Sequence, residues 1–263
     1  MDSVNKTLYI PLYGKSYVSR KGIIMHDPKA EQIWAAEGFP LKGKSKSKWL
    51  AYYLGMRAAV FDRWLEAQMD ADPSAVVLHI GCGLDSRVER VGTQGHLWFD
   101  IDFPDVIRER KRYYQEIAGY EMRGVDVRSA EWLGSVPGGN AIVVMEGVSM
   151  YLRSEELKQV LGQIAAHFDK VRMLMDCYTA FAAKASRVRN PINDVGVSQV
   201  YGLDDPKLLE GDGIAFVGEH GMAPADLVGE LRGMEKKVFK ALYAGSIAKR
   251  MYRLYEYRRD RWT

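Results

Sequence analysis

The stretch that decides the fold is Val76-Val77-Leu78-His79-Ile80-Gly81-Cys82-Gly83-Leu84-Asp85. Four of its first five residues are apolar and three are β-branched, so residues 76–80 predict a buried strand. The glycines of the following turn let the backbone bend sharply and approach a ligand, where a Cβ would collide. A dinucleotide-binding fingerprint would place a third glycine at position 86, where this chain has Ser86. The turn therefore favours a nucleoside cofactor without phosphates.

Acidic residues follow the next strand-like runs of the chain. Asp102 lies nineteen residues after Gly83, a spacing at which a carboxylate can accept hydrogen bonds from ribose hydroxyls. Asp126 and Glu146 end later runs. Taken singly, Asp126 could equally cap a helix and Glu146 could be a surface turn residue. Ligands of open parallel sheets gather at the carboxyl ends of the strands, so together these positions predict one cofactor crevice.

Short apolar runs alternate with amphipathic segments between residues 76 and 220, a pattern typical of βα units. We expect a Rossmann-like α/β fold, with a mostly parallel central sheet, helices on both faces and a closing edge strand at Met251–Tyr257. A helix should follow Pro104 and end before Gly119, and another should begin at Ser154, whose hydroxyl would cap it. The other predicted strands are residues 97–101, 141–145, 171–175 and 214–217, and residues 124–127 should form the end of a further strand.

We predict one domain over residues 1–263. Within it we distinguish an N-terminal helical cap (1–72), a cofactor-binding core (73–178), a substrate-side insertion (179–212) and a C-terminal completion of the sheet (213–263). The cap is expected because apolar residues recur at helical spacing between residues 28 and 70. The insertion is unusually long for a connection, and such segments often belong to an active site.

Composition excludes several classes of protein. The 37 basic and 34 acidic side chains are mixed along the chain, so nucleic acid is not an expected partner. The lysines between residues 42 and 48 are interpreted as a solvated flexible loop. Two cysteines without a CxxC spacing and no metal-ligand cluster predict no metal site and a reducing compartment. With no long apolar segment either, we expect a cytoplasmic protein that does not contact a membrane.

Three ordered motifs carry a resemblance to a known family. They are residues 81–87 (GCGLDSR), 100–104 (DIDFP) and 146–152 (EGVSMYL). Together with Asp27-Pro28, Arg57 and Phe61-Asp62 they resemble the leucine carboxyl methyltransferase family, including its tetracenomycin polyketide O-methyltransferase branch. The resemblance spans about residues 10 to 180. It implies a class I methyltransferase that uses S-adenosyl-L-methionine and releases S-adenosyl-L-homocysteine.

The resemblance also assigns cofactor contacts. Gly81 and Gly83 would lie against the methionine moiety, Asp102 would bind the ribose, and Asp126 with Val127 would flank the adenine. Glu146 would face the amino group of the cofactor. Arg57 would bind its carboxylate, a role suited to a planar guanidinium, and Lys15 is a further basic residue that would reach the cofactor.

The expected activity is methyl transfer to a carboxylate or hydroxyl of a small molecule, such as a polyketide-type secondary metabolite. The alternatives are a protein C-terminal carboxyl methyltransferase, an NAD-dependent Rossmann oxidoreductase and a non-catalytic cofactor-binding protein. The sequence singles out no catalytic residue: His79 is interpreted as a core histidine, and Cys82 and Cys177 as space-filling residues. Candidate substrate contacts in or beside the insertion are Tyr178, Arg187, Arg189 and Tyr201.

Overall fold

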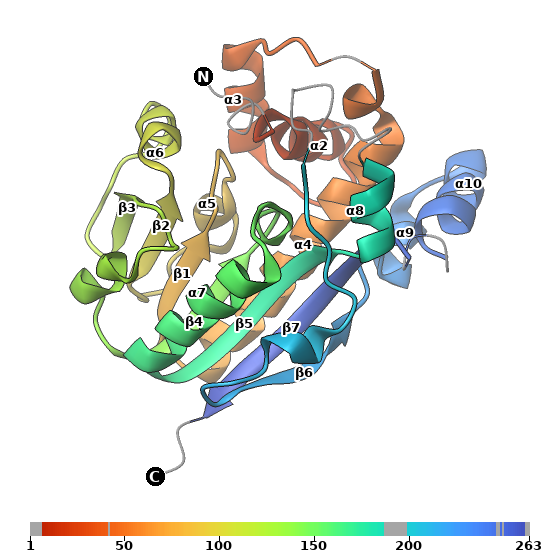
Figure 1. Ribbon diagram of the computed structural model, residues 1–263. Coiled ribbons are helices and arrows are strands. Elements are labelled where there is room, and N and C mark those ends of the chain that lie inside the picture. The colour runs from red at the N-terminus through yellow and green to blue at the C-terminus, as the bar shows by residue number, and fades with distance from the viewer. Residues whose placement is uncertain (1–6, 42, 187–198, 246–247, 249, 261–263) are drawn as a thin grey trace.

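A seven-stranded sheet forms the centre of the computed structural model, which describes residues 7–260 except 42, 187–198, 246–247 and 249. The strand order is β3-β2-β1-β4-β5-β7-β6, and the first five strands of that order run parallel (Figure 1). The strands are β1 (Val76–Ile80), β2 (Trp98–Asp102), β3 (Tyr120–Gly124), β4 (Gly139–Met145), β5 (Phe168–Tyr178), β6 (Ile214–His220) and β7 (Tyr252–Asp260). The predicted mostly parallel sheet is confirmed.

Helices cover both faces of the sheet, as predicted, with α7 in front of it and α4 behind it in Figure 1. The α-helices are α2 (Tyr9–Arg20), α3 (Pro28–Glu37), α4 (Lys48–Ala71), α5 (Arg87–Val91), α6 (Pro104–Arg110), α7 (Ser154–His167), α8 (Ala180–Ser186), α9 (Ala225–Glu230) and α10 (Gly233–Tyr243). Short 3-10 helices are η1 (Gly43–Lys46), η2 (Ala130–Ser135), η3 (Ser149–Tyr151) and η5 (Pro206–Leu209).

Strand β1 occupies the middle of the parallel part, between β2 and β4. All five of its residues are buried, because helices cover both of its faces and leave no solvated side. This burial explains why residues 76–80 read as a continuous apolar run. His79 is tolerated there because its Nδ1 lies 3.0 Å from Asp100 Oδ1 and its Nε2 lies 3.0 Å from Arg87 Nη1.

The last strand does not close the sheet at its edge, so the sequence prediction for residues 251–257 was wrong in that respect. β7 lies between β5 and β6 and runs antiparallel to both. Leu254, Tyr255 and Tyr257 are buried on β7, whereas β6 alternates between more buried and exposed residues. β6 is therefore the edge strand, and its alternating burial fits that place.

Two further local predictions need correction. The third strand, Tyr120–Gly124, ends at the first of the residues expected to finish it, because its pairing with β2 ends at Gly124. The helix after Pro104 ends at Arg110, well before Gly119. Tyr114 is buried, and the guanidinium carbon of Arg110 lies over the Tyr114 ring at 4.0 Å from its centroid. Tertiary packing, and not a continued helix, therefore accounts for the apolar spacing beyond residue 110.

The lysine-rich segment is more ordered than the flexible loop expected from its composition. Gly43–Lys46 forms the 3-10 helix η1, and Lys48 is the first residue of α4. The Ser47 hydroxyl accepts the amide of Trp49 and caps that helix. Helix α7 does begin at Ser154, but its cap is the Glu156 carboxylate, which accepts the Arg153 amide at 2.9 Å. The expectation of a Ser154 cap was wrong.

The N-terminal cap contains α2, α3 and α4, of which α2 was not predicted. Helices α9 and α10, between β6 and β7, were not predicted either, and they extend this cap. Phe239 of α10 packs edge to face on Tyr52 of α4, at 6.2 Å between ring centroids. Within the described residues, the helices are all too short or too polar to cross a bilayer.

Candidate active site

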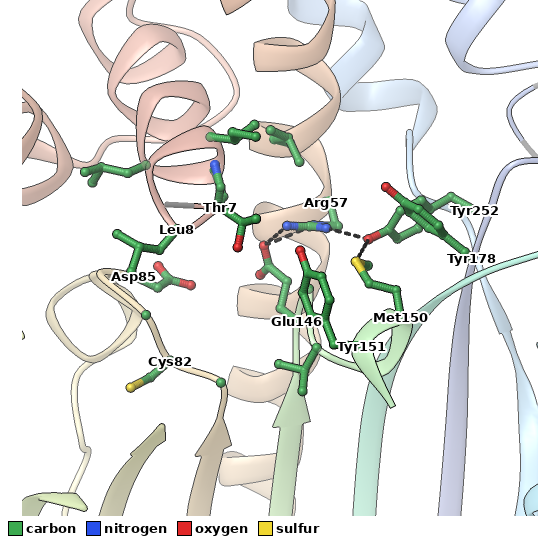
Figure 2. Close-up of a pocket in the computed structure, with 18 of the residues that line it drawn as sticks. Thr7, Leu8, Arg57, Cys82, Asp85, Glu146, Met150, Tyr151, Tyr178 and Tyr252 are labelled. Atoms are coloured by element: carbon green, nitrogen blue, oxygen red, sulfur yellow. Dashed lines mark hydrogen bonds and ion pairs between the residues drawn. The ribbon is translucent and has the colours of Figure 1, made fainter. Parts of the chain in front are cut away.

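A cavity of about 910 Å³ opens at the carboxyl ends of the parallel strands (Figure 2). Its walls come from the loops that follow β1, β2, β3 and β4 and from helices of the cap. This is the edge of a parallel sheet at which ligands usually bind. The cavity is lined by all eight residues expected to contact the cofactor: Lys15, Arg57, Gly81, Gly83, Asp102, Asp126, Val127 and Glu146.

The turn after β1 has the backbone that its glycines predict. Gly81 has a φ of +69° and Gly83 a φ of +49°, which L side chains rarely adopt. A Cβ on Gly81 would lie 1.9 Å from Cγ2 of Val148, another residue of the cavity wall. The amide of Gly81 donates to the Ile101 carbonyl at 2.7 Å and so ties the turn to β2. Position 81 therefore admits only glycine without rearrangement.

Asp102, at the end of β2, is held by two backbone amides. Its Oδ2 accepts the Gly83 amide and its Oδ1 the Phe103 amide, both at 2.8 Å. Each oxygen keeps a second accepting site, which suits a ribose diol. Burial raises the pKa of Asp102 to about 6, although the two amides act in the opposite direction. The carboxylate is therefore ionised at neutral pH and titrates just below it.

Arg57 of α4 lies between two buried carboxylates. Its Nη2 lies 2.9 Å from Glu146 Oε1, and its Nη1 donates to Tyr252 Oη at 3.0 Å (Figure 2). The same Nη1 lies 2.7 Å from Asp176 Oδ2. Arg87 also pairs with Glu146. The site thus presents cations and anions side by side, a charge pattern complementary to an amino-acid zwitterion.

Glu146 is ionised by its surroundings. Burial by itself would raise its pKa, but the charges of Lys15, Arg57 and Arg87 lower it to about 2. Asp176 behaves differently: its burial outweighs the attraction of Arg57 and raises its pKa. Glu146 therefore carries a full negative charge across the physiological pH range.

Lys15 reaches the cavity from α2. Its Nζ lies 2.8 Å from Asp85 Oδ2, and the two side chains are 3% and 8% exposed. Asp85 also pairs with Arg90 at 2.8 Å and with Arg87 at 3.3 Å. These cations hold the pKa of Asp85 well below its usual range despite its burial. A charged N-terminal helix is thereby fixed to the loop that carries Gly81 and Gly83.

Asp126 and Val127 follow β3 on a more open part of the wall. The Asp126 carboxylate pairs with Arg128 at 2.6 Å, which lowers its pKa. It does not cap an α-helix, the blander role considered for it. Both residues are only partly buried, unlike the ion-paired side chains around Arg57.

The residues interpreted as structural are buried and bonded. Burial lowers the pKa of His79 and raises those of Cys82 and Cys177, so the imidazole is neutral and both thiols are protonated near pH 7. In the part of the chain that the structure describes, three or more potential metal ligands never gather at one place.

The four candidate substrate contacts separate in the structure. Tyr178 lines the main cavity. Tyr201 lines a small separate cavity instead, where its amide donates to the Met150 carbonyl at 2.8 Å. Arg187 and Arg189 lie outside the described residues.

Several site residues were missed by sequence reasoning. Asp176 lies next to the end of a predicted strand and obeys the same rule of acidic strand ends that identified Asp102, so the signal was present. Asp85 was noticed only as part of the glycine turn. Tyr53, Tyr151 and Tyr252 also line the cavity, and no sequence spacing connects them because they come from α4, η3 and β7.

The sequence of the chain is similar to those of known methyltransferases. A family model described as leucine carboxyl methyltransferase matches residues 12–165. The chain is 32% identical over 186 residues to the tetracenomycin polyketide synthesis O-methyltransferase TcmP of Streptomyces glaucescens, covering 69% of each chain. It is 28% identical over 183 residues to the S-adenosyl-L-methionine-dependent methyltransferase dpfgK of Gibberella zeae, covering 64% of this chain and 61% of that one.

A solved structure supports the fold. Magnesium protoporphyrin IX methyltransferase (ChlM) from Synechocystis PCC 6803, crystallised with bound SAH, is 14% identical. It superposes with a TM-score of 0.53 over 89% of this chain and 94% of that chain. The sheet and its flanking helices are therefore those of a class I methyltransferase. With the family match over more than half of the chain, the protein belongs to the leucine carboxyl methyltransferase family.

Proposed function

We propose that this S-adenosylmethionine-dependent O-methyltransferase methylates a carboxylate of a small molecule, with a hydroxyl as the alternative acceptor. One observation carries the proposal. A single cavity of about 910 Å³ joins the eight cofactor-type residues to a second region lined by Tyr178 and other aromatic side chains. Ligand cavities usually measure about 300 to 1,000 Å³, so this one is large enough to take a cofactor and an acceptor side by side.

The cavity residues fit the cofactor by charge and by shape. Bound S-adenosylmethionine supplies a methyl group that is activated by a positively charged sulfur. Arg57 and Lys15 would hold the carboxylate of its methionine part, and Glu146 its ammonium group. Asp102 would accept the ribose hydroxyls, and Asp126 with Val127 would flank the adenine. Because Gly81 has no Cβ, Val148 packs directly against that turn.

The chain's own residues favour a carboxylate acceptor. A carboxylate is already ionised near pH 7 and needs no base, whereas a hydroxyl acceptor is helped by one. His79 is the histidine that lines the cavity, but Asp100 and Arg87 engage its two ring nitrogens. The residues would therefore act chiefly by orienting the reactants and excluding water, which contribute to the rate without proton transfer.

The small-molecule preference, including a polyketide-type acceptor, draws on the names of the relatives. Tyr178 is proposed as an acceptor contact because it lines the cavity. The division of the chain into cap, core, insertion and C-terminal part stays a prediction. So do the cytoplasmic location and the absence of a nucleic-acid partner.

A methyl-transfer assay tests the proposal. The protein is incubated with S-adenosylmethionine carrying a labelled methyl group, in parallel with small carboxylic acids, small phenols and a peptide ending in leucine. Methyl esters release labelled methanol in mild base and methyl ethers do not, so the product identifies the acceptor oxygen. We expect esters of small acids, with loss of product in Asp102→Ala. Transfer to the peptide alone would refute the small-molecule assignment.

A further inference from the structure

Four tyrosines form a continuous wall along the cavity, on four different elements. Tyr178 ends β5, Tyr252 begins β7, Tyr53 lies on α4 and Tyr243 ends α10, and all four line the cavity. Successive rings touch: Tyr178 to Tyr252 at 4.7 Å between centroids, Tyr252 to Tyr53 at 6.3 Å and Tyr53 to Tyr243 at 6.1 Å. We call this set the tyrosine wall. Figure 2 shows Tyr178 and Tyr252 across Arg57 from Cys82 and Asp85.

Contacts with neighbouring side chains hold the tyrosine wall in place. Tyr252 Oη receives a hydrogen bond from Arg57 Nη1 at 3.0 Å, which ties the wall to the cofactor end of the cavity. The Tyr243 ring stacks on Phe239, with centroids 5.2 Å apart and planes 15° from parallel. Tyr53 Oη lies 3.7 Å from Met222 Sδ. Rings that are already ordered lose little conformational entropy when a ligand binds, so the wall is preorganised.

The ring geometry selects for aromatic ligands. Successive ring planes are inclined at 76°, 84° and 52° to one another. The tyrosine wall therefore offers both ring edges and ring faces to a ligand along its length. Aromatic pairs gain electrostatic energy from edge-to-face and offset contacts beyond the burial of area. An aliphatic chain would gain burial alone. Apolar side chains that line the same cavity include Leu50, Leu54 and Ala182.

We propose that the tyrosine wall is the acceptor-recognition surface and that the acceptor is a planar, fused-ring aromatic molecule. This inference rests on the proposed function and adds to it the substrate class and three specificity-determining residues, Tyr53, Tyr243 and Tyr252, beside Tyr178. Tyr252 belongs to the tyrosine wall and also accepts a hydrogen bond from Arg57. A ring stacked on the wall therefore lies next to the methionine end of the cofactor region.

Calorimetry with matched probes tests the proposal. Anthracene-2-carboxylate, 2-hydroxyanthracene and dodecanoate are titrated into the protein, with and without saturating S-adenosylhomocysteine. Anthracene-2-carboxylate and dodecanoate each carry one carboxylate and differ in the rest of the molecule. We expect the anthracene acid to bind at least about tenfold more tightly, and Tyr178→Leu or Tyr243→Leu to weaken it roughly 3- to 10-fold while changing dodecanoate about twofold or less.

Controls separate recognition from folding. Tyr252→Phe keeps the ring and should retain the preference, whereas Tyr252→Leu should lose it. Phe181→Leu removes an aromatic residue of α8 that is 56% exposed and lies outside the cavity lining, so it should bind all probes like the parent. Equal affinity for the anthracene acid and dodecanoate would overturn the inference while leaving the function intact. Failure of S-adenosylhomocysteine to bind would instead refute the proposed function. The titrations without S-adenosylhomocysteine would still test whether the tyrosine wall prefers the anthracene acid to dodecanoate.

Discussion

Lys15 on α2 forms a buried ion pair with Asp85 in the loop after β1, at 2.8 Å. A second contact lies nearby, where Arg90 binds the α3 cap residue Asp27 at 2.7 Å. Asp27 Oδ1 in turn accepts the Ala30 amide at 2.9 Å. The helical cap is therefore joined ionically to the glycine turn of the candidate cofactor site, and removing one charge should affect both stability and binding.

Lys15→Met keeps the length of the side chain and removes its charge. Arg87 and Arg90 still compensate Asp85, so we expect a loss of about 1–3 kcal/mol of unfolding free energy rather than the larger cost of an isolated buried charge. Binding of S-adenosylhomocysteine should weaken as well. Lys21→Met is the control, because its ion pair with Glu235 is partly exposed and should cost about 1 kcal/mol or less. Chemical denaturation giving equal losses for both would contradict the prediction.

Arg57→Ala should weaken S-adenosylhomocysteine about 10- to 100-fold, as expected for the loss of charged hydrogen bonds. Methylthioadenosine lacks the amino-acid carboxylate and should be affected much less. Calorimetry with both ligands checks this, and equal losses would remove Arg57 from the carboxylate site.

The same variant leaves Glu146 and Asp176 without their shared cation, so it should also lose about 3–5 kcal/mol of stability. Adding Asp176→Asn removes one stranded carboxylate. The double variant should regain part of the stability without regaining affinity for S-adenosylhomocysteine.

Asp102→Ala should weaken S-adenosylhomocysteine and adenosine alike by about 1–3 kcal/mol, since both contain the ribose. Free methionine should not be affected. Asp105→Ala removes a nearby carboxylate outside the cavity lining and serves as the control. Unchanged adenosine affinity in Asp102→Ala would rule out the ribose assignment.

The pH dependence of binding should report the same residue. The pKa of Asp102 is raised to about 6, and the ionised form is the better acceptor for hydroxyls. Affinity should therefore be nearly constant above about pH 7, halve near the pKa of about 6 and approach a tenfold fall per pH unit below it, because the carboxyl must be ionised to bind. Calorimetric titrations with S-adenosylhomocysteine between about pH 5 and 8 measure this dependence, because that range brackets the pKa of Asp102. Asp102→Asn should flatten the profile, and an unchanged profile in that variant would assign the effect elsewhere.

Gly81→Ala should abolish cofactor binding and destabilise the fold, because a Cβ would lie 1.9 Å from Val148 Cγ2. Gly38→Ala is a matched control: its φ is +57° in the left-handed region, but nothing lies within 4 Å of the added carbon. The control should cost about 1–2 kcal/mol from backbone strain, and Gly81→Ala about 1–3 kcal/mol more. Adding Val148→Ala to Gly81→Ala should recover only the stability lost through the clash with Val148, and not the part lost through backbone strain. Equal denaturation midpoints for the two single variants would exclude the clash.

Local patterns carried the prediction of the parallel core. Strands β1, β2, β4 and β5 were found from short apolar runs, because their burial on both faces leaves a continuous signal. The shift of β3 and the early end of α6 were missed, since Tyr114 owes its burial to Arg110 and not to helical periodicity. Helices α9 and α10 were missed because they bury few residues, Leu227 and Val228 on α9 and Phe239 on α10, which leaves little helical periodicity in the sequence.

The sequence by itself determined the turn of Gly81 and Gly83, the strand before it and the carboxylate at Asp102, because these depend on residues close in the chain and on the alignment of parallel strand ends. Only the tertiary structure decided that Arg57 would meet Asp176, 119 residues away, and Tyr252, 195 residues away. It also placed β7 inside the sheet and assembled the tyrosine wall from four elements. Such contacts depend on how distant elements pack, and packing over that separation leaves no period in the sequence to read.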